Sequence, residues 1–260
     1  MQALEIVIMF IFGASIGSFL NVVIYRLPRK LPFLRFGERS HCPFCKKTLE
    51  PKDLIPIVSF LFLGGKCRHC KKHISAQYIL IESITGLFFV AIFLYSGWTW
   101  QLLAQFAVVS FAIPLIVIDA RHKIVPDVLS LPFIVVALVV GLLLHPHDWI
   151  SILLGGVIGA GFFFAQWFVS KGRWIGSGDI RLGAAMGFLL GWEHLLLALT
   201  LAYLSGTVVA IIALLFRLTK LKSTIAFGPY LLVATIVAFF FAQPIIDWYL
   251  DLIWIVMSPV

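Results

Sequence analysis

Long apolar runs separated by short polar stretches dominate this chain. Spanning the hydrocarbon core of a bilayer takes about 20 apolar residues, each rising 1.5 Å along a helix. Runs of this order predict transmembrane helices at 3–25, 77–96, 100–118, 127–144, 149–170, 180–191, 194–216 and 225–246. The sixth run is short, so it either spans imperfectly or enters the membrane as a half-helix shielded by protein. The first run is too long for the core of a cleaved signal peptide, so we expect it to be retained.

Composition supports the membrane as the solvent of this protein. Hydrophobic residues make up 61% of the chain and charged residues 12%, against about 45–50% and about 25% in soluble domains. We therefore predict an all-α membrane protein, a bundle of about eight transmembrane helices with a small cytoplasmic loop of the zinc-binding type. The net charge of +8 is confined to short stretches between apolar runs, so it indicates topology and not a nucleic-acid partner.

The basic residues also predict an orientation. Twelve of the 20 lysines and arginines lie in the segment 26–76, and the others follow the third, fifth and seventh predicted helices or, in the case of Arg181, lie at the start of the sixth. Cytoplasmic loops carry the excess of Lys and Arg. If the eight helices alternate with the N-terminus outside, every basic residue falls on the cytoplasmic side. The intervening loops near 97, 145–148 and 191–193 contain none.

All four cysteines lie in the segment 26–76. They form two Cys-x2-Cys pairs, Cys42 with Cys45 and Cys67 with Cys70, separated by 21 residues. Such pairs can close a tetrahedral four-thiolate zinc site, and a loop this polar has little core to order it otherwise. A pair of disulfides is the alternative, which a reducing cytoplasm disfavours. His41, His69 and His73 are possible substitute ligands, although each is better explained as a solvated loop histidine.

Two aspartates mark the same end of the predicted bundle. Asp119 ends the third apolar run, and Asp179 closes the sequence Gly176-Ser-Gly178-Asp at the start of the sixth. An acid in an apolar segment is costly and suggests function. Two carboxyls at one depth can meet, so that one ionises and activates water while its neighbour stays protonated and acts as an acid. This is the arrangement of an aspartyl protease.

Structural interpretations compete with the catalytic one. Asp179 is a possible helix N-cap after its Gly-Ser-Gly turn, and Asp119 is a possible interfacial acid paired with Arg121 or Lys123. For Asp127, which follows Val125-Pro126, we favour a helix cap. Glu82, early in the second run, is a candidate buried acid to which the pattern assigns no role.

Six motifs, which occur in a fixed order along the chain, resemble those of the bacterial type IV prepilin peptidase (leader peptidase/N-methyltransferase) family. The resemblance extends over nearly the whole length, and its Gly-x-Gly-Asp motif is shared with presenilin-like intramembrane proteases. The motifs, in order, are Gly13-Ala-Ser-Ile-Gly-Ser-Phe-Leu-Asn-Val-Val-Ile-Tyr-Arg-Leu-Pro28, Arg39-Ser-x-Cys-Pro-x-Cys45, Gly65-Lys-Cys-Arg-x-Cys70, Asp119 with Val125-Pro-Asp127, Gly176-Ser-Gly-Asp179, and Phe227-Gly-Pro229.

The resemblance implies that Asp119 and Asp179 are the catalytic pair, with Gly176, Gly178 and Asp127 supporting the site. It implies cleavage of the basic leader of prepilin or pseudopilin precursors at the cytoplasmic face of the bacterial inner membrane, after a glycine and before an apolar helix. N-methylation of the new N-terminal residue, often Phe, by S-adenosylmethionine would follow. This activity is associated with an N-terminal half at 1–96, and the peptidase with 97–260.

Two other classes of function compete with this hypothesis. In a proton-coupled transporter, intramembrane acids would relay protons, but such acids would be spread through the bilayer depth. In a non-enzymatic scaffold with a zinc loop, the two aspartates would have no role. The sequence does not give the S-adenosylmethionine site, nor does it choose among pilus, type II secretion and competence substrates.

Overall fold

The structure is a computed structural model that describes residues 2–31, 40–217 and 225–257, with side chains described as far as residue 253. Four basic residues that contribute to the predicted orientation lie outside the described residues. They are Arg35, Arg39, Lys220 and Lys222.

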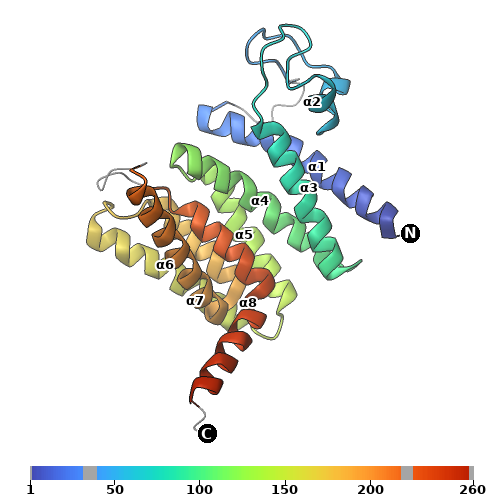
Figure 1. The fold of residues 1–260 in the computed structure, drawn as a ribbon. Coiled ribbons are helices and arrows are strands. Elements are labelled where there is room, and N and C mark those ends of the chain that lie inside the picture. The colour runs from blue at the N-terminus through green and yellow to red at the C-terminus, as the bar shows by residue number, and fades with distance from the viewer. Residues whose placement is uncertain (1, 32–39, 218–224, 258–260) are drawn as a thin grey trace. The chain divides into compact units, whose positions relative to one another are not determined.

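Helices account for nearly all of the regular structure in these ranges, which contain two isolated β-bridges and no strand. Seven helices in the described part of the chain are long and apolar enough to cross a membrane. They are α1 (Gln2–Arg26), α3 (Gln77–Ser96), α4 (Gln101–His122), α5 (Asp127–Leu144), α6 (Trp149–Ser170), α7 (Ser177–Leu215) and α8 (Gly228–Met257) (Figure 1). The short α2 (Val58–Phe62) and the 3-10 helices η1 (Leu27–Arg29) and η2 (Pro51–Asp53) lie between α1 and α3. The prediction of an all-α, multi-pass membrane protein is confirmed.

The chain forms two compact units, Met1–Pro114 and Leu115–Val260, which divide inside α4. The sequence-based division at residue 96 concerns activities and stays a prediction. In the first unit, α1 packs against α3 through small residues. A Cβ added at Gly13 would lie 2.8 Å from Cβ of Phe89, and one at Gly17 would lie 2.8 Å from Cα of Glu82. Glycine thus lets the two backbones approach closely, as membrane helices commonly do.

The second unit holds the C-terminal turns of α4 together with α5, α6, α7 and α8. Glycines also bring the backbones of α6 and α7 close together. Gly159 of α6 faces the backbone of Gly183 of α7, and Gly155 faces Gly187. From the first pair to the second, the residue number decreases along α6 and increases along α7. The two helices are therefore antiparallel here.

Helix α7 reverses direction at Gly191, which has φ 72° and ψ 171°. Beyond it, a Cβ at Gly159 would lie 3.4 Å from Leu195, and Gln166 bonds to Tyr203. In these two pairs the residue number increases along both helices, so the arm 192–215 runs parallel to α6. The short predicted run 180–191 and the run 194–216 are therefore the two arms of α7, joined by a single glycine instead of the expected polar loop.

Two other boundaries differ from the sequence prediction. Helix α4 continues to His122, past the predicted end at 118, so Asp119 lies inside the last turn of a helix. The run predicted at 225–246 and the tail after it, which we expected to form a separate interfacial helix, are one helix, α8, which continues through Pro244 to Met257. In both places the polar residues that end the apolar run, Asp119 and Asp247, do not end the helix, because backbone hydrogen bonding does not require apolar side chains.

Candidate active site and metal centre

The two cysteine pairs lie on matching turns. The N–H of Cys42 donates to the carbonyl of Lys47 (2.9 Å), and the N–H of Cys67 donates to that of Lys72 (2.9 Å). The residue after each second cysteine is left-handed, with φ 56° at Lys46 and 58° at Lys71. A β-bridge closes each turn, His41 with Thr48 and Lys66 with His73. The same backbone shape thus presents both Cys-x2-Cys pairs.

The four thiol sulfurs converge, all within 4.8 Å of one another, and Sγ of Cys42 and Cys70 are 3.9 Å apart. A tetrahedral zinc ion with zinc–sulfur distances near 2.3 Å needs sulfurs about 3.8 Å apart. The cluster therefore fits such an ion with little adjustment. His41, His69 and His73 are exposed and are not part of the group.

The thiols favour a bound cation electrostatically. Backbone N–H groups of Cys70 and His69 lower the pKa of Cys67 to about 7. The N–H of Lys72 favours the thiolate of Cys70, but burial and the neighbouring thiols raise its pKa to about 11. Four thiolates this close repel one another, so their joint ionisation requires a positive ion.

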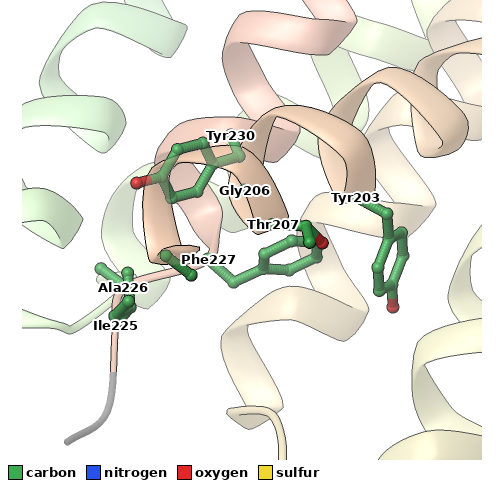
Figure 2. Close-up of a pocket in the computed structure, with 8 residues that line it drawn as sticks. Tyr203, Gly206, Thr207, Ile225, Ala226, Phe227 and Tyr230 are labelled. Atoms are coloured by element: carbon green, nitrogen blue, oxygen red, sulfur yellow. The ribbon is translucent and has the colours of Figure 1, made fainter. Parts of the chain in front are cut away.

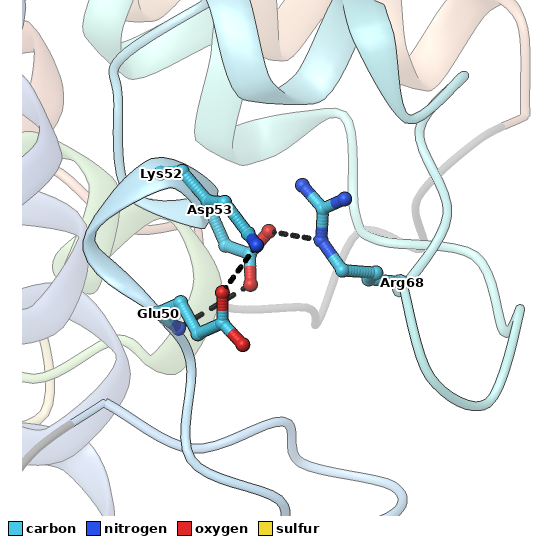
Figure 3. A network of polar contacts seen from close by, with 4 residues as sticks. All are labelled: Glu50, Lys52, Asp53 and Arg68. Atoms are coloured by element: carbon cyan, nitrogen blue, oxygen red, sulfur yellow. Dashed lines mark hydrogen bonds and ion pairs between the residues drawn. The ribbon is translucent and has the colours of Figure 1, made fainter.

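An ion-pair network ties the second cysteine turn to η2 (Figure 3). Nε of Arg68 donates to Oδ1 of Asp53 (2.7 Å), whose side chain is 3% exposed. Burial opposes ionisation of Asp53, but hydrogen bonds from Arg68 and the N–H of Glu50 outweigh it and lower the pKa of the carboxyl. Lys52 pairs with Glu50 at 2.5 Å on the surface. The network thus orders the segment between the cysteine pairs.

Glu82, to which the sequence assigned no role, is buried on α3. Its Oε2 accepts a hydrogen bond from the N–H of Ile57 (2.7 Å), and Ser18 of α1 bonds to the same carboxyl. Ile57 has φ 62°, which is unusual for a β-branched residue. Glu82 therefore has a structural role, joining α1, α3 and the strained entry to α2.

Asp119 is 6% exposed and faces the beginning of α8. The backbone N–H of Gly228 hydrogen-bonds to its carboxyl. A Cβ at Gly228 would lie 2.6 Å from Oδ2 of Asp119, so only glycine lets the backbone come this near. Helix N-termini present free N–H groups and stabilise negative charge.

Asp179 is 7% exposed and lies in the first turn of α7. Its Oδ2 accepts the N–H of Gly176 at 3.0 Å. The N-cap is Gly176, so the interpretation of Asp179 as the cap residue itself is wrong. A Cβ at Gly178 would lie 2.6 Å from Cβ of Val125, so this glycine lets the α7 turn pack closely on the α4–α5 connection.

The two carboxyls lie close enough for the charge of Asp119 to act on Asp179. Tyr203, on the second arm of α7, is also within electrostatic reach of Asp179. The second unit thus brings together two buried acids, each hydrogen-bonded to a backbone N–H at the start of a helix.

Asp127 is not the helix cap that the sequence suggests. The N-cap of α5 is Pro126, and Asp127 is the first helical residue, with no side-chain cap bond at this helix start. Its carboxylate instead pairs with Arg181 of α7, whose guanidinium also donates to the carbonyl of Val125 (3.4 Å). The pair holds the start of α5 against the turn that carries Asp179.

Sequence reasoning missed three residues near the acids: Gly228, Tyr203 and Arg181. Gly228 is part of the Phe227-Gly-Pro229 motif, which gave a signal but no role. Tyr203 lies within an apolar run, and Arg181 is a basic residue at the start of one. Both positions are fully explained by hydropathy, so neither suggested a role in the site.

Comparisons with known proteins identify the family of this chain. Residues 11–96 match the bacterial peptidase A24 N-terminal domain, and residues 106–242 match the type IV leader peptidase family. The chain is similar to the prepilin leader peptidase/N-methyltransferase of Bacillus subtilis (strain 168), at 33% identity over 249 residues, 94% of this chain and 98% of the relative. The protein of that name from Pseudomonas aeruginosa is 32% identical over 270 residues, 93% of this chain and 92% of the relative.

A third relative, the prepilin leader peptidase/N-methyltransferase of Legionella pneumophila, is 28% identical over 268 residues, 92% of each chain. No solved structure matches this chain. Since the family model covers more than half of the sequence and the relatives align over almost all of it, the chain belongs to the type IV leader peptidase family.

Proposed function

We propose that this protein is a membrane-embedded aspartic endopeptidase whose catalytic groups are Asp119 and Asp179. The observation that carries the proposal is that two buried carboxyls lie within electrostatic reach of each other in an apolar bundle, and that each accepts a hydrogen bond from a backbone N–H at the start of a helix. Two buried carboxyls within reach of each other in an apolar segment are costly, and intramembrane acids of this kind usually mark a functional site.

The chemistry follows from the requirements of amide hydrolysis. One carboxylate takes a proton from a water molecule as the water attacks the scissile carbonyl carbon. The protonated neighbour donates its proton to the carbonyl oxygen. As the carbon–nitrogen bond breaks, the carboxyl that took the proton of the water passes it to the leaving amine, and the neighbour takes its own proton back from the hydroxyl of the tetrahedral intermediate. The N–H groups of Gly228 and Gly176 fix the two carboxyls in place, which limits the reorganisation that the reaction needs.

We infer that the substrates are prepilin-like precursors, which carry a basic leader before an apolar helix. Cleavage after a glycine at the cytoplasmic face of the bacterial inner membrane agrees with the basic residues flanking α4, α6 and α7. The names of the relatives support both the substrate class and the second activity, methylation of the new N-terminus with S-adenosylmethionine as donor.

In the first unit, Cys42, Cys45, Cys67 and Cys70 would hold one zinc ion in a structural role. Four protein thiolates fill a tetrahedral site and leave no open position for a substrate or water. The ion would neutralise the thiolates and fix the two cysteine turns to each other. Asp53 and Arg68 brace the same segment from the side.

Replacing the carboxyls tests the proposal. We expect Asp119→Asn and Asp179→Asn each to lower cleavage of a prepilin-like substrate by on the order of 10²–10⁴-fold, because an amide supplies neither base nor acid. The double variant should be scarcely worse than either single one, since the two groups act as a unit. Loss of the leader is followed on a gel, using purified protein in detergent or lipid.

The matched control is Asp148→Asn, the same chemical change at an exposed residue that makes no cap bond at the start of α6. It should cleave at the normal rate. Normal processing by either the Asp119 or the Asp179 variant would exclude the aspartyl mechanism.

A further inference from the structure

The two units differ in where they leave apolar surface open. The second unit has a cavity of about 220 Å³, lined by Tyr203 and Gly206 of α7 and by Phe227 and Tyr230 near the start of α8 (Figure 2). The first unit carries exposed apolar side chains in the segment 54–63, between the two cysteine pairs. We call this segment the apolar loop segment. What covers its side chains follows from the depth at which it is held.

The apolar loop segment has the sequence Leu-Ile-Pro-Ile-Val-Ser-Phe-Leu-Phe-Leu and contains no charged residue. Its exposed large side chains are Leu54, Ile55, Val58, Leu61 and Phe62. The last three have the spacing i, i+3 and i+4, so they share one face of α2. Leu61 is 64% exposed and Phe62 is 88% exposed. A continuous apolar surface of this kind marks contact with a membrane or with another protein.

Other residues of the segment are fixed to the first unit. The N–H of Ile57 donates to Oε2 of Glu82 on α3 (2.7 Å). The ring of Phe60 lies over Gly65, where an added Cβ would be 3.0 Å from Cζ of Phe60. The exposed side chains therefore belong to an ordered segment with a defined position along α3.

The bond to Glu82 sets the depth of the segment. Helix α3 has 20 residues, so at 1.5 Å per residue it is about 30 Å long, which is the thickness of the hydrocarbon core. A helix of this length has no turns to spare outside the bilayer that it crosses. Glu82 is five residues beyond Gln77, the first residue of α3, which is about 7–8 Å along the helix axis. The bond thus holds Ile57 near the boundary between headgroups and acyl chains.

The charges next to the segment fit this depth. Lys52 precedes the segment and Lys66 follows it, and both side chains are exposed. Long basic side chains at the ends of an apolar membrane segment reach the phosphate groups, while the apolar residues between them stay among the acyl chains. A protein partner would have to enter the same layer of the membrane to reach this face.

We propose that the apolar loop segment is an interfacial membrane anchor, whose exposed side chains insert among the lipid acyl chains beside α1 and α3. Its partner is the lipid bilayer. Since Cys67 follows the segment directly after Gly64, Gly65 and Lys66, the anchor holds the four-cysteine cluster close to the lipid surface. This inference goes beyond the proposed peptidase and methyltransferase activities and depends on neither.

Photo-crosslinking tests the proposal on the full-length protein in vesicles of phosphatidylethanolamine and phosphatidylglycerol. The photoreactive residue benzoylphenylalanine replaces Phe62, whose exposed side chain makes little contact with the rest of the chain. On irradiation, we expect the protein to gain the mass of one phospholipid, as measured by mass spectrometry. The same probe at Leu87, an exposed residue inside α3, gives the reference yield for a position that faces lipid.

The matched control carries the probe at Lys47, an exposed residue of the first cysteine turn among polar neighbours. It should give only a small fraction of the lipid adduct seen at Phe62. If the protein with the probe at Phe62 does not purify as a single species, the probe at Leu61 replaces it, because Leu61 lies on the same face of α2.

A probe in this face that forms no lipid adduct, while the probe at Leu87 does, would overturn the proposal. Crosslinks from the face to another polypeptide would also overturn it, because the face would then dock a protein. Equal yields of lipid adduct at Phe62 and Lys47 would show that lipid contact is not a property of the apolar loop segment.

Discussion

At the scale of single residues, two glycines determine how closely the neighbouring backbone can approach the acids. Gly228 lets the start of α8 reach Asp119, and Gly178 lets the turn before Asp179 settle against Val125. Each position is intolerant of a side chain for a different reason, contact with a carboxyl in one case and with an aliphatic side chain in the other.

Gly178→Ala tests this dependence. The added Cβ would lie 2.6 Å from Cβ and 2.8 Å from Cγ2 of Val125, so the Asp179 turn has to shift. A shift near 1 Å can cost on the order of 10²-fold in rate, and we expect a fall in kcat/KM of about this size. Val125→Gly in the same chain, which removes the opposing atoms, should restore part of the activity. An unimpaired Gly178→Ala enzyme would show that this contact does not position the acid.

Sequence alone could single out Asp119 and Asp179 as buried acids, because a carboxyl in an apolar run stands out. It could not place Asp127 correctly, since an aspartate at a helix start after Val-Pro looks like a cap. Only the approach of α7 supplies Arg181 as its partner. In the same way, Glu82 acquires its role from Ile57, a contact between distant segments that no local pattern contains.

At the scale of elements, two local features shape the two units: the reversal in α7 and the paired cysteine turns. The hydropathy pattern predicted both: it divided the apolar stretch near Gly191, and it grouped the cysteines in one polar loop. What it could not give is the absence of a loop at the reversal, because a turn made by one glycine leaves almost no polar signature.

Gly191→Ala should destabilise the protein. Its φ of 72° and ψ of 171° are accessible mainly to glycine, and a Cβ would lie 2.7 Å from Oγ of Ser151. Such strain costs on the order of 1–3 kcal/mol, which should lower the midpoint of thermal unfolding in detergent. Gly161→Ala, in an open position inside a helix, should instead raise the midpoint slightly. Equal midpoints for the two variants would contradict the strained reversal.

The two cysteine turns together predict that the protein binds a metal ion. Purified protein should contain about one zinc per chain, the stoichiometry of a single four-thiolate site. Changing Cys42, Cys45, Cys67 and Cys70 to Ser should remove it, as measured by elemental analysis. Replacing the exposed His41, His69 and His73 by Ala should leave the metal in place. Metal retained by the four-serine variant would rule out this site.

At the scale of the whole molecule, the reversal in α7 and the distribution of charge bear on the same question. Seven apolar helices would put the two ends of the chain on opposite sides of the membrane if each crossed once. Because α7 turns back at Gly191, the chain crosses eight times if each arm traverses the membrane. The first arm, 177–190, would be about 21 Å long at 1.5 Å per residue, which is shorter than the hydrocarbon core of about 30 Å.

The crossing number decides where the basic residues lie. With eight crossings and the N-terminus outside, Lys123, Lys171 and Arg217 are all cytoplasmic, in agreement with the preference of Lys and Arg for that side. With an uninterrupted α7, Arg217 would be outside. We therefore expect reporters fused after Lys47, Lys123, Lys171 and Arg217 to be active in the cytoplasm, and those after His147 and Trp192 to be active outside.

The fusions after Trp192 and Arg217 distinguish eight crossings from seven, because the short first arm of α7 is the segment whose crossing of the membrane is least certain from its length. A reporter after Trp192 that is cytoplasmic would mean that the first arm enters the membrane and returns without crossing. Arg217 would then lie outside, and the basic residues would no longer share one side. Agreement of both fusions with eight crossings would place the starts of α5 and α7 on the cytoplasmic side. Asp119 and Asp179 would then lie at the membrane face where a basic leader is presented.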